Sequence, residues 1–189
     1  SPTHTLKCVD KRVDNEYFSK IELPNWLSYA RGGGRTIKTA SEKMTRKNAH
    51  WNKNFFNYKV KEKTINYRDS GANGAAMRIL PIALANLGNA DKIKEEIFCN
   101  SIVTHGHPRA IVGAILYGYA INQIITFKPE YFNWENFISM LGKDIHKQFE
   151  FTFNESDDIK SWLQIWNSDD TKKFQEIYDK TLDEVQEQL

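Results

Sequence analysis

Residues 70 to 78 read Ser-Gly-Ala-Asn-Gly-Ala-Ala-Met-Arg and lead directly into Ile79-Leu-Pro81. Residues 104 to 109 read Thr-His-Gly-His-Pro-Arg and precede an apolar run. Ordinary core packing requires neither motif. The small residues of the first motif let the backbone approach a ligand closely, and the start of a helix favours anions. Together the two motifs indicate one pocket for a phosphorylated ligand.

Each motif also has a plainer interpretation. The glycines of the first can simply join a loop to a core helix, and on that segment alone we weigh the two interpretations evenly. If the segment is functional, the Asn73 amide can bond a ribose or phosphate oxygen, and Arg78 can pair with a phosphate or a buried carboxylate. His105 and His107 have the residue type of metal ligands, but no third ligand at a suitable spacing is nearby. Hydrogen bonding to a substrate is therefore the favoured role for both.

The rest of the chain predicts an all-α fold, as a single compact multi-helix domain over residues 1–189. No stretch alternates with a period of two for long enough to predict a strand, and residues 51–69 are expected to form a long loop. A helix is expected to begin near Ala72, and Pro81 requires that it kink or restart there. Its expected buried side consists of Met77, Leu80, Leu84 and Leu87.

Four further helix starts are expected, and each has a capping or first-turn signal. Pro108 fits the first position of one helix, and Asn133 fits the cap of another. Ser156 precedes a segment that contains two tryptophans, and Ser168 is expected to start a last amphipathic helix. The inward residues of that last helix are expected to be Phe174, Ile177, Tyr178, Leu182 and Val185.

Composition excludes several classes of protein. The chain has 189 residues and a formal net charge of +2, which does not by itself argue for a nucleic-acid partner, although basic residues concentrate between Arg31 and Lys63. Cys8 and Cys99 lie far apart and lack metal-ligand spacing. No apolar run is long enough for a membrane span, and no signal peptide is visible. We therefore expect a cytoplasmic protein and consider nucleic acid unlikely as a partner.

The residues quoted above also carry a family resemblance. The stretch from Ser70 to Leu84, followed about twenty residues later by Thr104-His-Gly-His-Pro-Arg-Ala110, resembles the ADP-ribosylglycohydrolase family, which includes the dinitrogenase-reductase-activating glycohydrolases and the ADP-ribosyl-acceptor hydrolases. The resemblance is strongest over residues 24–125. It implies an all-α domain with a cleft that holds ADP-ribose beside a pair of Mg²⁺ ions. The implied reaction is hydrolysis of the bond between ADP-ribose and a modified acceptor.

The resemblance also implies roles for particular residues. Ligand-binding residues would lie on both motifs, with His105 and His107 at the border of the cleft. The implied ligand-binding set is Gly71, Ala72, Asn73, Gly74, Met77, Arg78, His105 and His107. The implied partner is ADP-ribose or an ADP-ribosylated protein.

The family's metal ligands are not found in this chain. They come from an early Thr/Ser-Asp-Asp-Thr motif and a late Asp-x-Asp-Thr motif. This chain begins Ser1-Pro-Thr-His-Thr-Leu6, and Ser168-Asp-Asp-Thr171 lies after the histidine motif, in the wrong order, so it is expected to cap a helix. We therefore assign no metal ligand and no catalytic residue. We expect either an incomplete or shortened hydrolase or a non-catalytic relative that binds ADP-ribose or a partner. The oligomeric state stays open.

Overall fold

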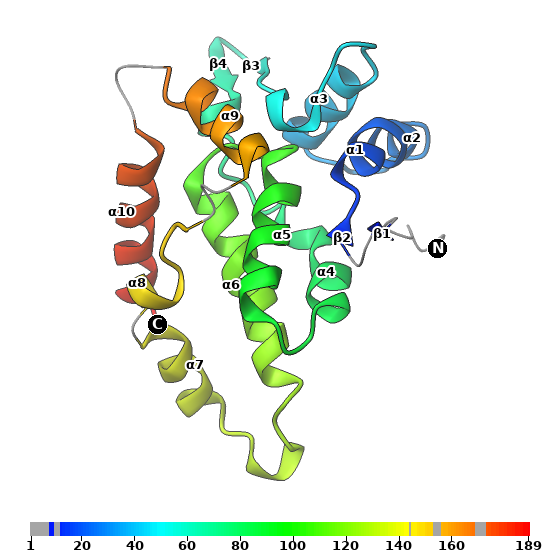
Figure 1. Cartoon of the computed structure of the whole chain (residues 1–189). Coiled ribbons are helices and arrows are strands. Elements are labelled where there is room, and N and C mark those ends of the chain that lie inside the picture. Colours follow the sequence, from blue (N-terminus) through cyan, green and yellow to red (C-terminus); the bar gives the residue numbers. More distant parts are fainter. Residues whose placement is uncertain (1–7, 10–11, 144, 153–155, 169–172) are drawn as a thin grey trace.

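The computed structural model describes residues 8–9, 12–143, 145–152, 156–168 and 173–189. The fold is all-α, as the sequence predicts, with two short hairpins (Figure 1). The α-helices are α1 Asn15–Tyr17, α2 Leu23–Leu27, α3 Arg35–Met44, α4 Leu80–Ala85, α5 Ala90–Ile102, α6 Pro108–Ile124, α7 Trp134–Gly142, α8 Ile145–Gln148, α9 Asp157–Trp166 and α10 Phe174–Gln186. The π-helical turn η1 spans Phe18–Glu22, and the 3₁₀ turns are η2 Trp51–Lys53, η3 Tyr67–Asp69, η4 Ala76–Arg78 and η5 Pro129–Tyr131. The strands are β1 Cys8–Val9, β2 Arg12–Val13, β3 Asn57–Val60 and β4 Lys63–Asn66.

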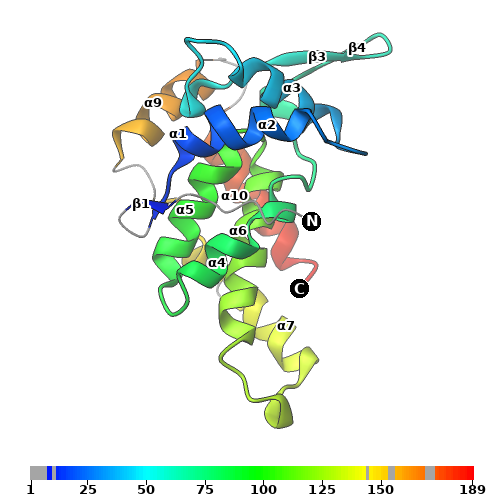
Figure 2. The ribbon, with the colours of Figure 1, turned by 90° about the vertical axis from the view of Figure 1, so that its right-hand side faces the viewer.

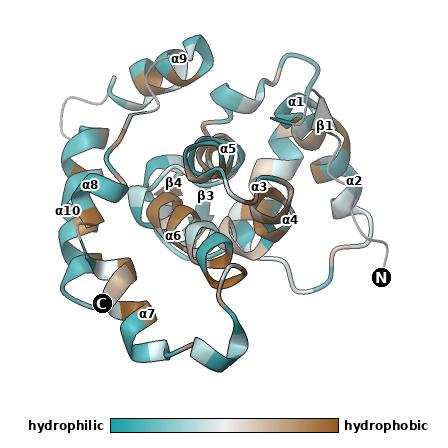
Figure 3. Cartoon of the chain, turned by 60° about the horizontal axis from the view of Figure 1, so that its bottom comes forward, coloured by the Kyte–Doolittle hydropathy of each residue, from teal (hydrophilic) through white to brown (hydrophobic). Residues whose placement is uncertain are grey.

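Helices α5 and α6 lie side by side at the centre of the molecule, and the other helices surround them (Figures 1 and 3). Gly118 of α6 makes the close approach possible. A Cβ atom at this position would lie 2.1 Å from Cδ1 of Ile97, which no real contact tolerates. Gly113 of α6 is different, since a Cβ there would meet nothing within 4 Å. Only one of these two glycines is needed for packing.

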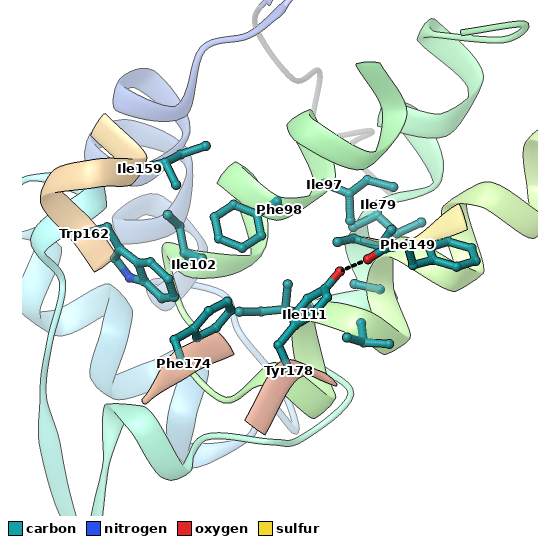
Figure 4. Close-up of a cluster of buried hydrophobic side chains, with 14 of the residues drawn as sticks. Ile79, Ile97, Phe98, Ile102, Ile111, Phe149, Ile159, Trp162, Phe174 and Tyr178 are labelled. Atoms are coloured by element: carbon teal, nitrogen blue, oxygen red, sulfur yellow. Dashed lines mark hydrogen bonds between the residues drawn. The ribbon is translucent and has the colours of Figure 1, made fainter. Parts of the chain in front are cut away.

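Helices α9 and α10 close the core with aromatic side chains (Figure 4). Three aromatic side chains are completely buried: Trp162, Phe174 and Tyr178. The centroids of the Trp162 and Phe174 rings lie 5.0 Å apart. The Tyr178 hydroxyl donates a hydrogen bond of 3.0 Å to the Phe149 carbonyl, which ties α10 to the chain after α8. Burial of three aromatic rings makes this end of the chain an integral part of the core.

The helix expected from Ala72 begins later, and its buried side was predicted wrongly. Residues 72–75 form a turn, η4 follows, and α4 starts with Pro81 in its first turn, so the chain restarts there as the proline requires. Met77 is 76% exposed, and Leu80, Leu84 and Leu87 are also exposed. The inward residues are instead Ala75, Ile79, Ile82 and Ala83. The 3₁₀ turn rotates the side chains away from the positions that one continuous α-helix would give them.

The expected loop over residues 51–69 contains a β-hairpin. Strands β3 and β4 pair antiparallel, with Tyr58 opposite Ile65 and Val60 opposite Lys63. The hairpin projects from the end of the molecule that carries α3 (Figure 2). The aromatic residues at its base, Phe55 and Phe56, pack against the core. Each strand has four residues, too few for the alternation to be recognised in the sequence.

Most of the expected helix starts are confirmed. Asn133 caps α7 by accepting from the Asn136 N–H at 2.8 Å, Pro108 is the first residue of α6, and Ser156 precedes α9. The prediction that Ser168 starts the last helix is wrong: that helix begins at Phe174, and the Ser168 hydroxyl instead donates to the Ile165 carbonyl at 2.7 Å, at the end of α9. The other residues of the expected cap, 169–171, lie outside the described residues. No helix in the described ranges is both long and apolar enough to cross a membrane.

Candidate functional site

The two sequence motifs meet in space although about thirty residues separate them. The turn at residues 71–74 lies against the loop that joins α5 to α6. A Cβ at Gly74 would lie 2.8 Å from Cε1 of His105 and 2.7 Å from Cδ1 of Ile37, so any larger residue there would force one of these side chains to shift. Gly71 faces the His107 ring at an ordinary contact distance, since its Cβ would lie 3.5 Å from Cγ. The glycine turn therefore rests on both imidazoles.

Arg78 fixes the glycine turn from behind. Its Nη1 donates to the Gly74 carbonyl at 3.0 Å, while Nε and Nη2 donate to the side chain and backbone oxygens of Asn100 at 2.8 and 2.7 Å. Burial lowers the pKa of Arg78 to about 10, so the guanidinium keeps its charge at neutral pH. Arg78 thus directs these donors at α5 and the turn. Its partners are one amide oxygen and two backbone carbonyls, whereas the sequence indicated a phosphate or a buried carboxylate.

His105 is buried beneath the turn and is neutral. Burial, together with the nearby charge of Arg78, lowers its pKa to about 3. Its Nδ1 lies 2.7 Å from the Thr104 hydroxyl, and its buried Nε2 has no hydrogen-bond partner among the described residues. The His105 side chain is only 1% exposed, so it supports the Gly74 backbone and does not reach solvent.

His107 lies at the start of α6 and acts as its cap. Its Nδ1 accepts from the Arg109 N–H at 3.1 Å, so one of the free donors expected at this helix start is already engaged. Gly106, between the two histidines, is fixed as well. Its carbonyl accepts from the Trp166 indole at 2.8 Å, and a Cβ there would collide with the Tyr67 ring. The loop that carries both histidines is therefore rigid.

A cleft of about 510 Å³ opens beside the glycine turn. Gly71 and Ala72 form part of one side, and the hairpin β3–β4 forms another. The complete lining is Thr36, Tyr58, Val60, Lys63, Ile65, Asp69, Ser70, Gly71, Ala72 and Arg109. The cleft has the volume of a small-molecule site, and its wall joins apolar side chains to a few polar groups.

Two cations line the cleft, and a set of backbone donors lies in the glycine turn beside it. Lys63 is exposed on the hairpin, and Arg109 donates to a Glu184 carboxylate oxygen at 2.9 Å. That hydrogen bond from Arg109 lowers the pKa of Glu184. The backbone N–H groups of Ala72 and Asn73 donate to no group in the described part of the chain. Unengaged N–H groups beside two cations are suited to an anionic ligand.

The comparisons with known proteins decide the family. The family model described as ADP-ribosylglycohydrolase matches residues 5–187. The chain belongs to the ADP-ribosylglycohydrolase family. It is 37% identical over 57 residues to the ADP-ribosyl-[dinitrogen reductase] glycohydrolase of Rhodospirillum rubrum, a match that covers 30% of this chain and 19% of that protein. The chain thus spans about a fifth of the curated relative that it matches. No solved structure matches it.

The described residues do not fit the pair of Mg²⁺ ions that the ADP-ribosylglycohydrolase family implies. Mg²⁺ prefers oxygen ligands in octahedral geometry. Asp69 is the carboxylate in the lining of the cleft, where it lies with Lys63 and Arg109. Within the described ranges, no group of three or more His, Cys, Asp or Glu side chains is placed to hold a metal ion. We therefore derive no chemical step through a metal.

The predicted ligand-binding residues of this ADP-ribosylglycohydrolase chain fall into three groups. Gly71 and Ala72 line the cleft. Asn73 and Met77 follow these two residues in the sequence and are exposed, but they are not part of the lining. The Asn73 amide has no hydrogen-bond partner among the described residues. The remaining members form the turn or contact it, and they are Gly74, Arg78, His105 and His107. Direct ligand contact by any of the eight remains a prediction.

Sequence reasoning missed the hairpin side of the cleft. Tyr58, Val60, Lys63 and Ile65 line it, yet they lie in a stretch expected to be a loop. Tyr58 and Val60 do alternate with Asn57 and Lys59, as in a strand with one covered face, but the alternation ends after four residues and does not distinguish a strand from a loop.

Proposed function

We propose that this chain binds the ADP-ribose group of a modified acceptor in the cleft between the glycine turn and the hairpin β3–β4. In its complete form, the protein would hydrolyse the bond between ADP-ribose and that acceptor. One observation carries the proposal. The motif residues Gly71 and Ala72 form a wall of a cleft that also contains Lys63 and Arg109. The name of the Rhodospirillum rubrum relative supports an ADP-ribosylated protein as the substrate.

The chemistry of the lining supports a role for each part. The pyrophosphate is held by Lys63, Arg109 and the backbone N–H groups of Ala72 and Asn73, because charged donors form strong hydrogen bonds with phosphate oxygens. The Asn73 amide, exposed and without a hydrogen-bond partner in the described ranges, bonds a ribose hydroxyl. His105 and Arg78 keep the turn in place, and neither acts on the reacting bond.

A non-catalytic relative that binds ADP-ribose without turnover is the second candidate. The observation that favours it is the lining of the cleft, in which Asp69 supplies the carboxylate among the described residues. Hydrolysis of a glycosidic bond typically uses a pair of carboxyl groups or a metal-bound water. Binding that does not depend on metal and that is not followed by release of ADP-ribose distinguishes this candidate from the enzyme.

Isothermal titration of ADP-ribose, with and without Mg²⁺, tests the proposal. We expect saturable binding by the wild-type chain and weaker binding by Lys63→Gln, which removes a cation from the cleft. Lys47→Gln is the matched control, because Lys47 is exposed and lies outside the cleft lining. An assay for release of ADP-ribose from an ADP-ribosylated protein separates the two candidates. If ADP-ribose does not bind under either condition, both candidates are wrong.

Ligand-linked stability gives an independent readout of the same binding. A ligand that binds only the folded state stabilises it by about 2.7 kcal/mol when its concentration is 100 times Kd. We therefore expect ADP-ribose to raise the melting temperature of the wild-type chain, and to raise that of Lys63→Gln less at the same concentration. An equal rise in the two proteins would show that Lys63 makes no contact with the ligand.

A further inference from the structure

The hairpin gives the cleft an apolar wall that the family motifs do not account for. In an antiparallel pair, residues opposite each other point to the same face, so Tyr58, Val60, Lys63 and Ile65 share one face. All four line the cleft, whereas Asn57, Lys59, Thr64 and Asn66 belong to the opposite face. The cleft therefore has one aromatic and aliphatic side, which ends at a lysine near the tip of the hairpin.

The Tyr58 ring is held in a fixed orientation. The buried Phe56 ring lies next to it, with an interplanar angle of 30° and 6.4 Å between the ring centroids. Its hydroxyl shares a 2.9 Å hydrogen bond with Thr36 Oγ1, in the first turn of α3. Both partners belong to elements outside the hairpin strands. A ring held by a neighbouring ring and by its hydroxyl loses little conformational entropy when a ligand stacks on it.

We propose that Tyr58 is the stacking platform for the nucleobase of the ligand, with Val60 and Ile65 completing an apolar base subsite. This proposal rests on the proposed function, because it assigns the part of the cleft that takes the base. The arrangement of charges supports it. Lys63 and Arg109 also line the cleft, so a ligand with a flat aromatic end and an anionic centre matches both kinds of lining at once. A purine nucleoside diphosphate has this chemistry.

The test compares three ligands on four proteins by isothermal titration. ADP-ribose and AMP carry the base, and ribose 5-phosphate lacks it. The proteins are the wild type, Tyr58→Leu, Tyr58→Phe and the control Tyr131→Leu, in which the altered tyrosine is 78% exposed and lies outside the cleft lining. Leucine keeps apolar contact with Phe56, and phenylalanine keeps the ring while losing the bond to Thr36. Circular dichroism and melting curves establish that each variant is folded.

We expect Tyr58→Leu to weaken ADP-ribose and AMP binding by roughly tenfold to a hundredfold, the range measured for loss of one aromatic–base stack. Tyr58→Phe should bind both within a few-fold of the wild type, and Tyr131→Leu should match it. Ribose 5-phosphate should bind more weakly than AMP to the wild type and equally to all four proteins.

The outcomes separate this inference from the proposed function. If ADP-ribose binds the wild type and Tyr58→Leu equally, the platform is wrong and the proposed function stands. If AMP binds in a Tyr58-dependent manner while ADP-ribose does not bind, the base subsite stands and the proposed function is wrong. If ribose 5-phosphate binds the wild type as tightly as AMP, the base contributes nothing and the platform is wrong. If no ligand binds, both are wrong.

Discussion

Gly74 is the residue at which the two motifs depend on each other most directly. In Gly74→Ala, the new methyl would lie 2.7 Å from Ile37 Cδ1 and 2.8 Å from His105 Cε1, and the His105 ring is completely buried. Overpacking of this kind typically costs about 1–3 kcal/mol. We expect a loss of that size in the free energy of unfolding, measured with urea.

Gly113 provides the matched control for this prediction. It is exposed in the middle of α6, and an added Cβ would meet nothing within 4 Å. Gly113→Ala should therefore stabilise the chain by about 0.5–1 kcal/mol, because alanine restricts the unfolded chain and favours helix. If both substitutions are neutral, the contacts described for Gly74 are absent in solution.

His105 makes stability depend on pH in a predictable direction. Its pKa is lowered from 6.5 to about 3 in the folded chain. As pH falls below about 6.5, the unfolded chain gains a proton that the folded chain does not accept until about pH 3. The stability associated with neutral His105 is thus complete above pH 6.5 and is lost as pH falls toward 3. The slope from this one group is about 1.4 kcal/mol per pH unit.

Urea unfolding of the wild type and His105→Asn between pH 7 and 4 measures that slope. The variant should lose stability less steeply in this range, whatever its stability at pH 7. His50→Asn serves as the control, since its ring is 62% exposed, and its slope should resemble that of the wild type. Parallel slopes for wild type and His105→Asn would contradict the burial of a neutral imidazole.

At the scale of elements, the sequence predicted helix starts well and the glycine-rich region poorly. Asn133 marks a helix start through a side-chain cap, and Pro108 through its fixed backbone angle, and both signals are local. Ser156 precedes α9 without a side-chain cap bond. Met77, Leu80, Leu84 and Leu87 face solvent because the 3₁₀ turn η4 precedes α4. That turn is set by contacts of Gly74 and Arg78 with α5 and the histidine loop. Those contacts are distant in sequence, so periodicity alone does not reveal them.

In the candidate site too, the sequence indicated some features, while others depend on contacts between residues far apart in the chain. The meeting of the two motifs was expected from their residue types, and the structure brings Gly71 and Gly74 against His107 and His105. The hairpin wall was not expected. A four-residue strand gives too few alternations to be distinguished from a loop, and its place beside the cleft depends on the packing of Phe55 and Phe56 at its base.

The hairpin turn itself offers a test at this scale. Lys61 has a φ of +55°, the left-handed region that costs an L-residue roughly 1–2 kcal/mol. A two-residue loop with positive φ at its first position favours glycine there. Lys61→Gly should therefore stabilise the chain by about 0.5–1 kcal/mol, whereas Glu62→Gly should destabilise it slightly. Thermal melting of the two variants decides this, and a loss of stability in Lys61→Gly would show that the turn has another geometry.

At the scale of the whole molecule, helix α9 supports the site although none of its residues lines the cleft. Arg68, which immediately precedes Asp69, donates to the carbonyls of Trp166 and Ile165 at 2.8 Å each. The Trp166 indole holds the Gly106 carbonyl between the two histidines. Helix α9 therefore fixes both the loop before the glycine turn and the histidine loop.

These contacts, with a continuous core, predict that residues 1–189 unfold as one domain. One cluster of buried residues runs from Val13 to Leu182 and includes Trp162, Phe174 and Tyr178. A chain that ends at residue 152 would lose these three rings and expose the surfaces of α5 and α6 that they cover. Each ring contributes roughly 3–5 kcal/mol on truncation, and their sum is comparable with the total stability of a domain, about 5–15 kcal/mol. We expect the chain of residues 1–189 to show a single urea transition that fluorescence and circular dichroism report identically, and the shortened chain to show none. A cooperative transition in the shortened chain would mean that α9 and α10 form a separate unit, and the rigidity of the histidine loop would then need another cause.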